Sequence, residues 1–144
     1  MMLRMDAIIP EEIRQQLTNL GVGVLYLYGS RAQGTAHAGS DYDIGVVFDD
    51  PQKADFDLDR YSALYGTLNA IFPDNIRGPK LDIAFLQRAN AKLQLDAVQY
   101  GRAVFESNPR VRADYEESVI KHYDDYRFLE REYEDATFGA FSKA

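Results

Sequence analysis

Residues 22–48 read VGVLYLY GSRAQGTAHAGS DYDIGVVF, and this stretch decides the fold. Val22 to Tyr28 is short and rich in β-branched and aromatic residues, which predicts a buried strand ending at Gly29. The polar, glycine-containing segment Ser30 to Ser40 predicts a short helical turn followed by a loop. Asp41 to Phe48 is apolar after its first residues, and we expect it to form a second strand.

The rest of the chain alternates between helical and strand patterns. Apolar residues recur at three- and four-residue intervals over about 10–20, 57–72, 89–100 and 110–135, which predicts four helices, the last one long. Residues 80–86 predict a third strand and residues 102–105 a brief edge strand, whereas residues 73–79 predict a loop and 137–144 a frayed tail. This order of elements indicates an α/β or α+β domain, with a small mixed sheet and flanking helices.

Composition limits what the protein can be. A chain of 144 residues has the size of one domain, and we expect a single unit with a core over about 8–106. The chain contains no cysteine, which excludes disulfides, thiolate catalysis and cysteine-rich zinc sites. Any metal must therefore be bound by oxygen ligands or by histidine.

Charge and hydropathy exclude two further classes of function. The formal net charge of −7 opposes general binding to nucleic acid, because a field of that sign repels a polyanionic backbone. No apolar run approaches the roughly 20 residues that cross a bilayer, and the first ten residues do not resemble a signal peptide. We expect a cytoplasmic protein with no membrane partner.

Three aspartates stand where carboxylates can converge. Asp41 and Asp43 are two residues apart in a strand pattern, so their side chains share one face about 7 Å apart. Asp82 lies in the third strand, and it could approach the first two if the strands are neighbours. Crowded carboxylates repel one another unless a divalent cation lies between them, which points to Mg²⁺. The alternative is structural: the aspartates end turns, cap loops or pair with arginines.

Gly29 and Ser30 follow the first strand, where a phosphate could approach. Glycine lets a ligand come close to the backbone, and the amides that follow can point at an anion. Arg31 could contact a phosphate through two hydrogen bonds. Each has a simpler alternative, which is a common turn for the Gly-Ser pair and a surface ion pair for Arg31. His37 and His122 lack a second histidine at ligand spacing, and we assign them no role.

Together these residues resemble a known signature. Gly29-Ser30, ten intervening residues, Asp41-Tyr42-Asp43 and the later Asp82 are similar to the motif of the polymerase β-type nucleotidyltransferases, over roughly residues 25–86. The resemblance implies that Gly29 and Ser30 hold a nucleoside triphosphate and that Asp41 and Asp43 bind the metal ions. It implies that Asp82 completes the metal site and assists deprotonation of the acceptor hydroxyl.

The chain as a whole also resembles the minimal nucleotidyltransferase (MNT) antitoxins of HEPN/MNT toxin–antitoxin pairs. The similar features are GSRAQG at residues 29–34, VFE at residues 104–106 and a tyrosine-rich last helix. This resemblance implies the nucleotidyltransferase fold, a cognate HEPN ribonuclease toxin as partner and a hetero-oligomer with it. It further implies that ATP and Mg²⁺ are used to transfer AMP to a tyrosine of the toxin, which blocks it.

Two other functions stay open at this point. The first is nucleotide transfer to a small hydroxylated molecule, as in aminoglycoside nucleotidyltransferases, although a second substrate-binding domain would then have to come from dimerisation. The second is an antitoxin that only covers its partner. The final helix carries a stripe that either packs on the sheet or binds a partner. Its residues are Tyr115, Val119, Tyr123, Tyr126 and Tyr133.

Overall fold

The computed structural model describes residues 9–34, 36, 39–73 and 78–142. In chain order the elements are α1 (Glu11–Asn19), β1 (Val22–Tyr28), α2 (Ser30–Gln33), β2 (Tyr42–Phe48), η2 (Pro51–Ala54), α3 (Leu58–Asn69), β3 (Leu81–Phe85), η3 (Leu86–Arg88), α4 (Ala91–Tyr100), β4 (Arg102–Glu106) and α5 (Pro109–Ser142). Residues 74–77 of the predicted loop, and His37, lie outside the described residues.

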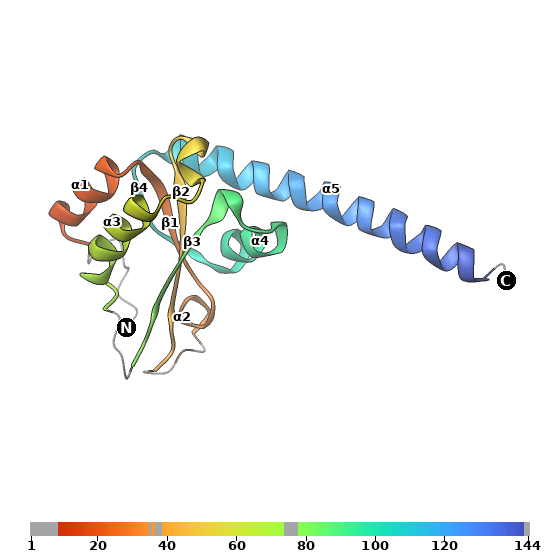
Figure 1. The fold of residues 1–144 in the computed structure, drawn as a ribbon, viewed down its shortest axis with the longest axis horizontal. Coiled ribbons are helices and arrows are strands. Elements are labelled where there is room, and N and C mark those ends of the chain that lie inside the picture. Colours follow the sequence, from red (N-terminus) through yellow and green to blue (C-terminus); the bar gives the residue numbers. More distant parts are fainter. Residues whose placement is uncertain (1–8, 35, 37–38, 74–77, 143–144) are drawn as a thin grey trace.

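One four-stranded mixed sheet organises the molecule, in the order β3-β2-β1-β4. β1 runs antiparallel to both β2 and β4, whereas β2 and β3 are parallel. A parallel pair needs a crossover connection, and the segment containing α3 supplies it between β2 and β3. The predicted α+β class, with its mixed sheet and flanking helices, is confirmed (Figure 1).

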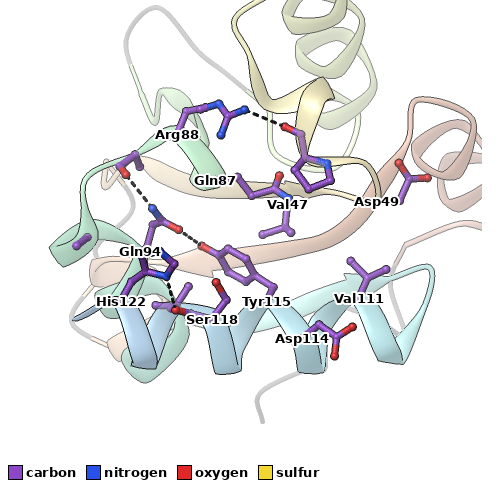
Figure 2. A pocket seen from close by; sticks show the side chains of 14 residues that line it. Val47, Asp49, Gln87, Arg88, Gln94, Val111, Asp114, Tyr115, Ser118 and His122 are labelled. Atoms are coloured by element: carbon purple, nitrogen blue, oxygen red, sulfur yellow. Dashed lines mark hydrogen bonds between the residues drawn. The ribbon is translucent and has the colours of Figure 1, made fainter. Parts of the chain in front are cut away.

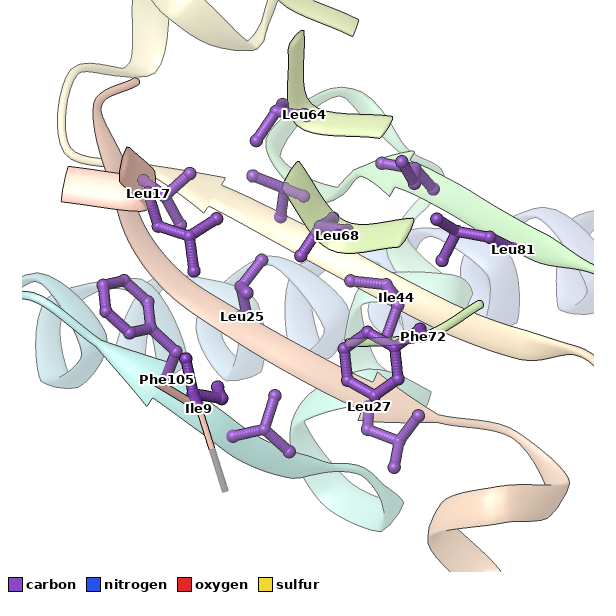
Figure 3. Packing of buried hydrophobic residues seen from close by; sticks show 14 of the residues in the cluster. Ile9, Leu17, Leu25, Leu27, Ile44, Leu64, Leu68, Phe72, Leu81 and Phe105 are labelled. Atoms are coloured by element: carbon purple, nitrogen blue, oxygen red, sulfur yellow. The ribbon is translucent and has the colours of Figure 1, made fainter. Parts of the chain in front are cut away.

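Two apolar layers sandwich the sheet, because successive strand residues point to opposite faces. The larger layer lies between the sheet and helices α1 and α3 (Figure 3). It includes Leu17 of α1, Leu64 and Leu68 of α3, and Leu25, Ile44 and Ile83 of the strands. The smaller layer lies under α4 and the first turns of α5, and it includes Val24, Tyr26, Val47, Ala97, Tyr115 and Val119. Both sheet faces are therefore covered, and the alternation assigns each strand residue to one layer.

Local sequence signals set several helix starts. Asp57 precedes α3, and its side chain accepts a hydrogen bond from the amide of Arg60 at 3.0 Å. Asn90 does the same for α4, accepting from the amide of Leu93 at 2.8 Å. Such caps satisfy amides that have no partner within the helix.

The final helix is longer than the sequence predicted. We expected it to end near residue 135 and residues 137–144 to fray, but α5 runs from Pro109 through Ser142. The chain contains no proline after Pro109, so no residue of this kind breaks the helical hydrogen bonds before Ser142. At about 1.5 Å per residue, its 34 residues form a rod of about 50 Å, most of which projects beyond the body (Figure 1). None of the described helices is long and apolar enough to cross a membrane.

Candidate active site

The fold brings two of the three predicted aspartates together. Asp43 near the start of β2 and Asp82 near the start of β3 are direct partners in the parallel ladder. Their neighbours Ile44 and Ile83 point into the layer under α1 and α3, so both carboxylates lie on the opposite face. Tyr28, the last residue of β1, pairs with Asp43 from the other side. The predicted approach of Asp82 to the first motif is confirmed by this register.

Gly29 occupies a conformation that suits glycine alone. Its φ of +71° and ψ of −153° lie in a region that side-chain-bearing residues avoid. A Cβ atom at this position would overlap Oδ2 of Asp43 and lie 3.3 Å from its Cγ. The missing side chain thus makes room for the Asp43 carboxylate. The carbonyl of Gly29 then accepts from the amides of Ala32 and Gln33, both at 3.2 Å, which starts the single turn of α2.

The carboxylates at this end of the sheet are crowded, and Asp43 is partly buried whereas Asp41 and Asp82 are exposed. Burial raises the pKa of Asp43 above its usual range, and the nearby charges of Asp82 and then Asp41 raise it further. Burial, followed by the charges of Asp43 and Asp82, raises the pKa of Tyr28 to about 12. The site therefore favours any change that lowers its negative charge, and a bound cation is one such change.

Asp41 is placed differently from the other two. It lies one residue before β2, and its Oδ1 accepts a hydrogen bond from the amide of Lys80 at 3.1 Å. The amide of Tyr42 donates to the carbonyl of Lys80 at 2.8 Å, so the two contacts hold the starts of β2 and β3 together. Among the described residues, no three histidine or acidic side chains form a group that could hold a metal ion.

The donor chemistry nonetheless fits Mg²⁺. This ion uses one or two protein carboxylates and completes its shell with water and substrate phosphates. Asp43 and Asp82 supply two such carboxylates side by side, in surroundings where negative charge is already disfavoured. A site that includes Asp41 as a third ligand stays a prediction.

Ser30 and Arg31 begin the turn of α2. Arg31 donates from Nε and Nη2 to the carbonyl of Ser40, at 3.0 and 2.7 Å. Its guanidinium also lies 4.0 Å from the ring centre of Tyr42. These contacts hold the end of the loop just before Asp41. The phosphate-binding role of Gly29, Ser30 and Arg31 stays a prediction, and Arg31 has a positioning role that the sequence did not reveal.

Tyr28 and Tyr42 are residues of the site that the sequence analysis did not single out. The alternation along β1 was a usable signal, because it puts Tyr28 on the same face as Tyr26 and opposite to Leu27. Tyr42 also packs on Phe72, with ring centres 5.4 Å apart. Its contact with Arg31 joins residues from different elements, and no local pattern reveals such a contact.

A large cavity lies at the other end of β2. Its volume is about 660 Å³, and side chains of β2, η3, α4 and α5 line it (Figure 2). Val47 of β2 is one of these side chains. Asp43 precedes Val47 by four residues, which is about 13 Å along a strand. The cavity is therefore separate from the carboxylates.

These features define a class of protein. A carboxylate pair on neighbouring strands, beside a Gly-Ser turn that follows β1, is the arrangement expected of a nucleotidyltransferase. Residues 11–110 match the family described as Polymerase beta, Nucleotidyltransferase, and the chain belongs to this family.

Solved structures with the same fold come from toxin–antitoxin systems. A chain from a toxin–antitoxin structure with AMP-PNP is 22% identical, with a TM-score of 0.64 over 89% of this chain and 97% of that one. A chain from a tri-AMPylated Shewanella oneidensis HEPN toxin in complex with MNT antitoxin is 16% identical, with a TM-score of 0.57 over 89% and 98%. A chain from the toxin–antitoxin MntA–HepT is 16% identical, with a TM-score of 0.56 over 90% and 99%.

The likeness to MNT antitoxins that the sequence predicted is thereby confirmed at the level of the fold. Among curated proteins, no sequence matches this chain significantly.

Proposed function

We propose that this protein is an antitoxin that transfers AMP from ATP to a tyrosine hydroxyl of a cognate HEPN ribonuclease toxin, with Mg²⁺ as cofactor. The observation that carries the proposal is the pairing of Asp43 with Asp82 across β2 and β3, next to Gly29. The solved structures lend support, since one of them contains AMP-PNP and another an AMPylated HEPN toxin. The proposal places the protein in the cytoplasm, as the sequence led us to expect.

Asp43 and Asp82 have the central roles in the proposed reaction. The oxygen of the acceptor hydroxyl attacks the α-phosphorus of ATP, the bond from this phosphorus to the bridging oxygen breaks, and pyrophosphate leaves. The hydroxyl proton passes to the carboxylate of Asp82. Asp43 and Asp82, with Asp41 beside them, would hold Mg²⁺, which supplies positive charge where the phosphates gain negative charge.

The other residues of the site have binding and positioning roles. Gly29 and Ser30 would bind the triphosphate through the backbone at the start of α2. Arg31 holds the loop before Asp41 through its two hydrogen bonds to Ser40. Burial and the neighbouring carboxylates keep the pKa of Tyr28 at about 12, so its hydroxyl stays protonated at neutral pH.

Mass spectrometry of the toxin tests the proposal. The full chain is incubated with ATP, Mg²⁺ and the HEPN-type toxin encoded beside it, and the intact mass of the toxin is measured. We expect the mass to increase by one or more AMP groups with the natural chain. The Asp43→Asn variant should transfer none, because it keeps the shape of the side chain but removes its charge. The Asp49→Asn variant is a matched control, since Asp49 follows β2 at the other end of the strand and is exposed.

The results also separate the two alternatives. A protein that only covers its toxin would protect cells as well with Asp43→Asn as without it, and the toxin would gain no mass. A small-molecule transferase would leave the toxin unmodified and consume ATP only when a hydroxylated acceptor is added. Equal transfer by the natural chain and the Asp43→Asn variant would contradict the assigned site.

A further inference from the structure

The part of α5 that projects from the body continues the face that packs on the sheet. Tyr115 and Val119 are buried against β1 and α4, at 8% and 5% exposure. Further along the same helix, Tyr126 is 52% exposed, Leu129 66% and Tyr133 74%. Single exposed apolar residues are common on protein surfaces, but a row that extends a buried face calls for an explanation.

The spacing of this row is that of a coiled coil. Its residues follow one another at intervals of four, three, four, three, four and three. They are Tyr115, Val119, His122, Tyr126, Leu129, Tyr133 and Ala136, and we call this row the α5 seam. An average interval of 3.5 residues keeps a seam facing one partner helix along its whole length. The partner at the body end is the protein's own sheet, whereas from His122 onward no described residue covers the seam.

The cavity described above opens at the point where the seam leaves the sheet. Tyr115, Val119 and His122 of the seam line it together with Val47 and Gln94 (Figure 2). The hydroxyl of Tyr115 donates to Oε1 of Gln94 at 3.0 Å and fixes one wall. A helix lying along the seam would therefore find room for its terminal side chains in a space of about 660 Å³.

The charged residues that flank the seam indicate which kind of helix can bind along it. Between residues 116 and 137, the positions that flank the seam on either side include Asp125, Glu130 and Glu132. None of these flanking positions carries a basic residue. The basic residues of this part of the helix, Lys121, Arg127 and Arg131, all fall on the outer face. Two copies of α5 would bring acidic flanks together in either orientation, which disfavours self-association. A helix of another protein with lysine or arginine along its flanks is complementary.

We propose that the α5 seam from His122 to Ala136 pairs with an α-helix of the cognate toxin, whose apolar stripe is flanked by basic residues. This inference rests on the proposed function for the identity of the partner, and it adds the surface by which that partner is bound. The carboxylate site is left free by such docking, because it lies at the other end of the sheet from the start of α5 (Figure 1).

Binding of the purified toxin to variants of the full chain tests the inference. We expect Leu129→Glu to raise the Kd by about 30-fold or more, the effect of losing a central apolar contact in an interface. Phe128→Glu is the matched control, because Phe128 is 63% exposed on the same helix but lies outside the seam. It should change the Kd by less than about threefold, as expected for a residue outside the contact. Glutamate is a good helix former, so circular dichroism should show equal helix content for both variants.

A charge reversal tests the choice of occupant. Replacing Asp125 and Glu132 together by lysine should weaken toxin binding by about tenfold or more, and raised salt should weaken the natural complex. A natural chain that dimerises on its own through the seam, with Leu129→Glu breaking the dimer, would overturn the assignment of the occupant. Equal Kd values for Leu129→Glu and Phe128→Glu would overturn the seam as the surface.

The two proposals fail in different ways. Asp43→Asn should still bind the toxin through the α5 seam, even though it transfers no AMP. If the natural chain transfers AMP and Leu129→Glu leaves the Kd unchanged, the proposed function stands and this inference is wrong. If Leu129→Glu raises the Kd but the natural chain transfers no AMP, this inference stands and the proposed function is wrong. A natural chain that does not bind the toxin at all would overturn this inference.

Discussion

Replacing Gly29 by alanine probes the contact between the Gly-Ser turn and the carboxylates. The new Cβ would occupy a backbone conformation of φ +71° and ψ −153° and would overlap Oδ2 of Asp43. Backbone strain of this kind costs about 1–3 kcal/mol. The displaced carboxylate of Asp43 would also be pushed out of a site already crowded by Asp82.

We expect a total loss of about 3 kcal/mol in the free energy of unfolding, which for a domain of this size lowers Tm by about 10 °C. Displacing a group of the site by about 1 Å can cost about 100-fold in rate, so AMP transfer should fall by a similar factor. Thermal unfolding followed by circular dichroism gives the stability, and the mass assay described above gives the rate.

Gly34→Ala is the matched control for this substitution. Gly34 also has a positive φ, +76°, but a Cβ there would meet no atom within 4 Å. It should cost only the left-handed strain of about 1 kcal/mol. Equal losses of stability for Gly29→Ala and Gly34→Ala, with transfer retained in Gly29→Ala, would refute the argument that Gly29 makes room for Asp43.

Three further substitutions separate the core, a buried hydroxyl and the carboxylate pair. Leu68→Ala should lower the free energy of unfolding by about 2–5 kcal/mol in urea titrations, because the side chain of Leu68 in α3 is fully buried. Tyr26→Phe should cost about 1 kcal/mol at pH 7, since the Tyr26 hydroxyl donates to Glu116 at 2.8 Å. Burial and Glu116 raise the pKa of Tyr26, so its neutral form stabilises the fold fully below about pH 10 and this contribution falls as the pH rises further. The difference between the natural chain and Tyr26→Phe should therefore shrink in urea titrations above that pH, and a constant difference would contradict the assignment. Asp82→Asn should leave stability unchanged or raise it by up to about 1 kcal/mol without metal, because it removes the repulsion with Asp43, and it should abolish AMP transfer.

The sequence predicted those parts of the fold that depend on local patterns. The strand before Gly29 followed from its short run of β-branched and aromatic residues, and the helices followed from apolar residues at three- and four-residue intervals. The order of the strands in the sheet could not be predicted from local patterns. β4 is the last strand in the chain and pairs with β1, the first, and such a pairing depends on long-range contacts. The helix α5 continues to Ser142, past the end near residue 135 that the sequence analysis predicted.

Details of the site depended on contacts between distant residues. Asp41 belongs to the Asp-Tyr-Asp motif that is visible in the sequence. Its side chain, however, accepts a hydrogen bond from the backbone amide of Lys80, which comes 39 residues later. Arg31 was predicted as a phosphate ligand from its place after Ser30, and its contact with the Tyr42 ring has no counterpart in local spacing. The contact between Asp41 and Lys80 forms only when β2 and β3 lie side by side, which the sequence left as a condition.

The register between β2 and β3 couples folding accuracy to chemistry. A slip of β3 by one residue would turn Asp82 into the apolar layer and bring Leu81 and Ile83 out to the other face. Burying a lone carboxylate there costs several kcal/mol, so an inactive register is also an unstable one. The stable register is therefore also the active one, because the same pairing that buries Ile83 aligns Asp82 with Asp43.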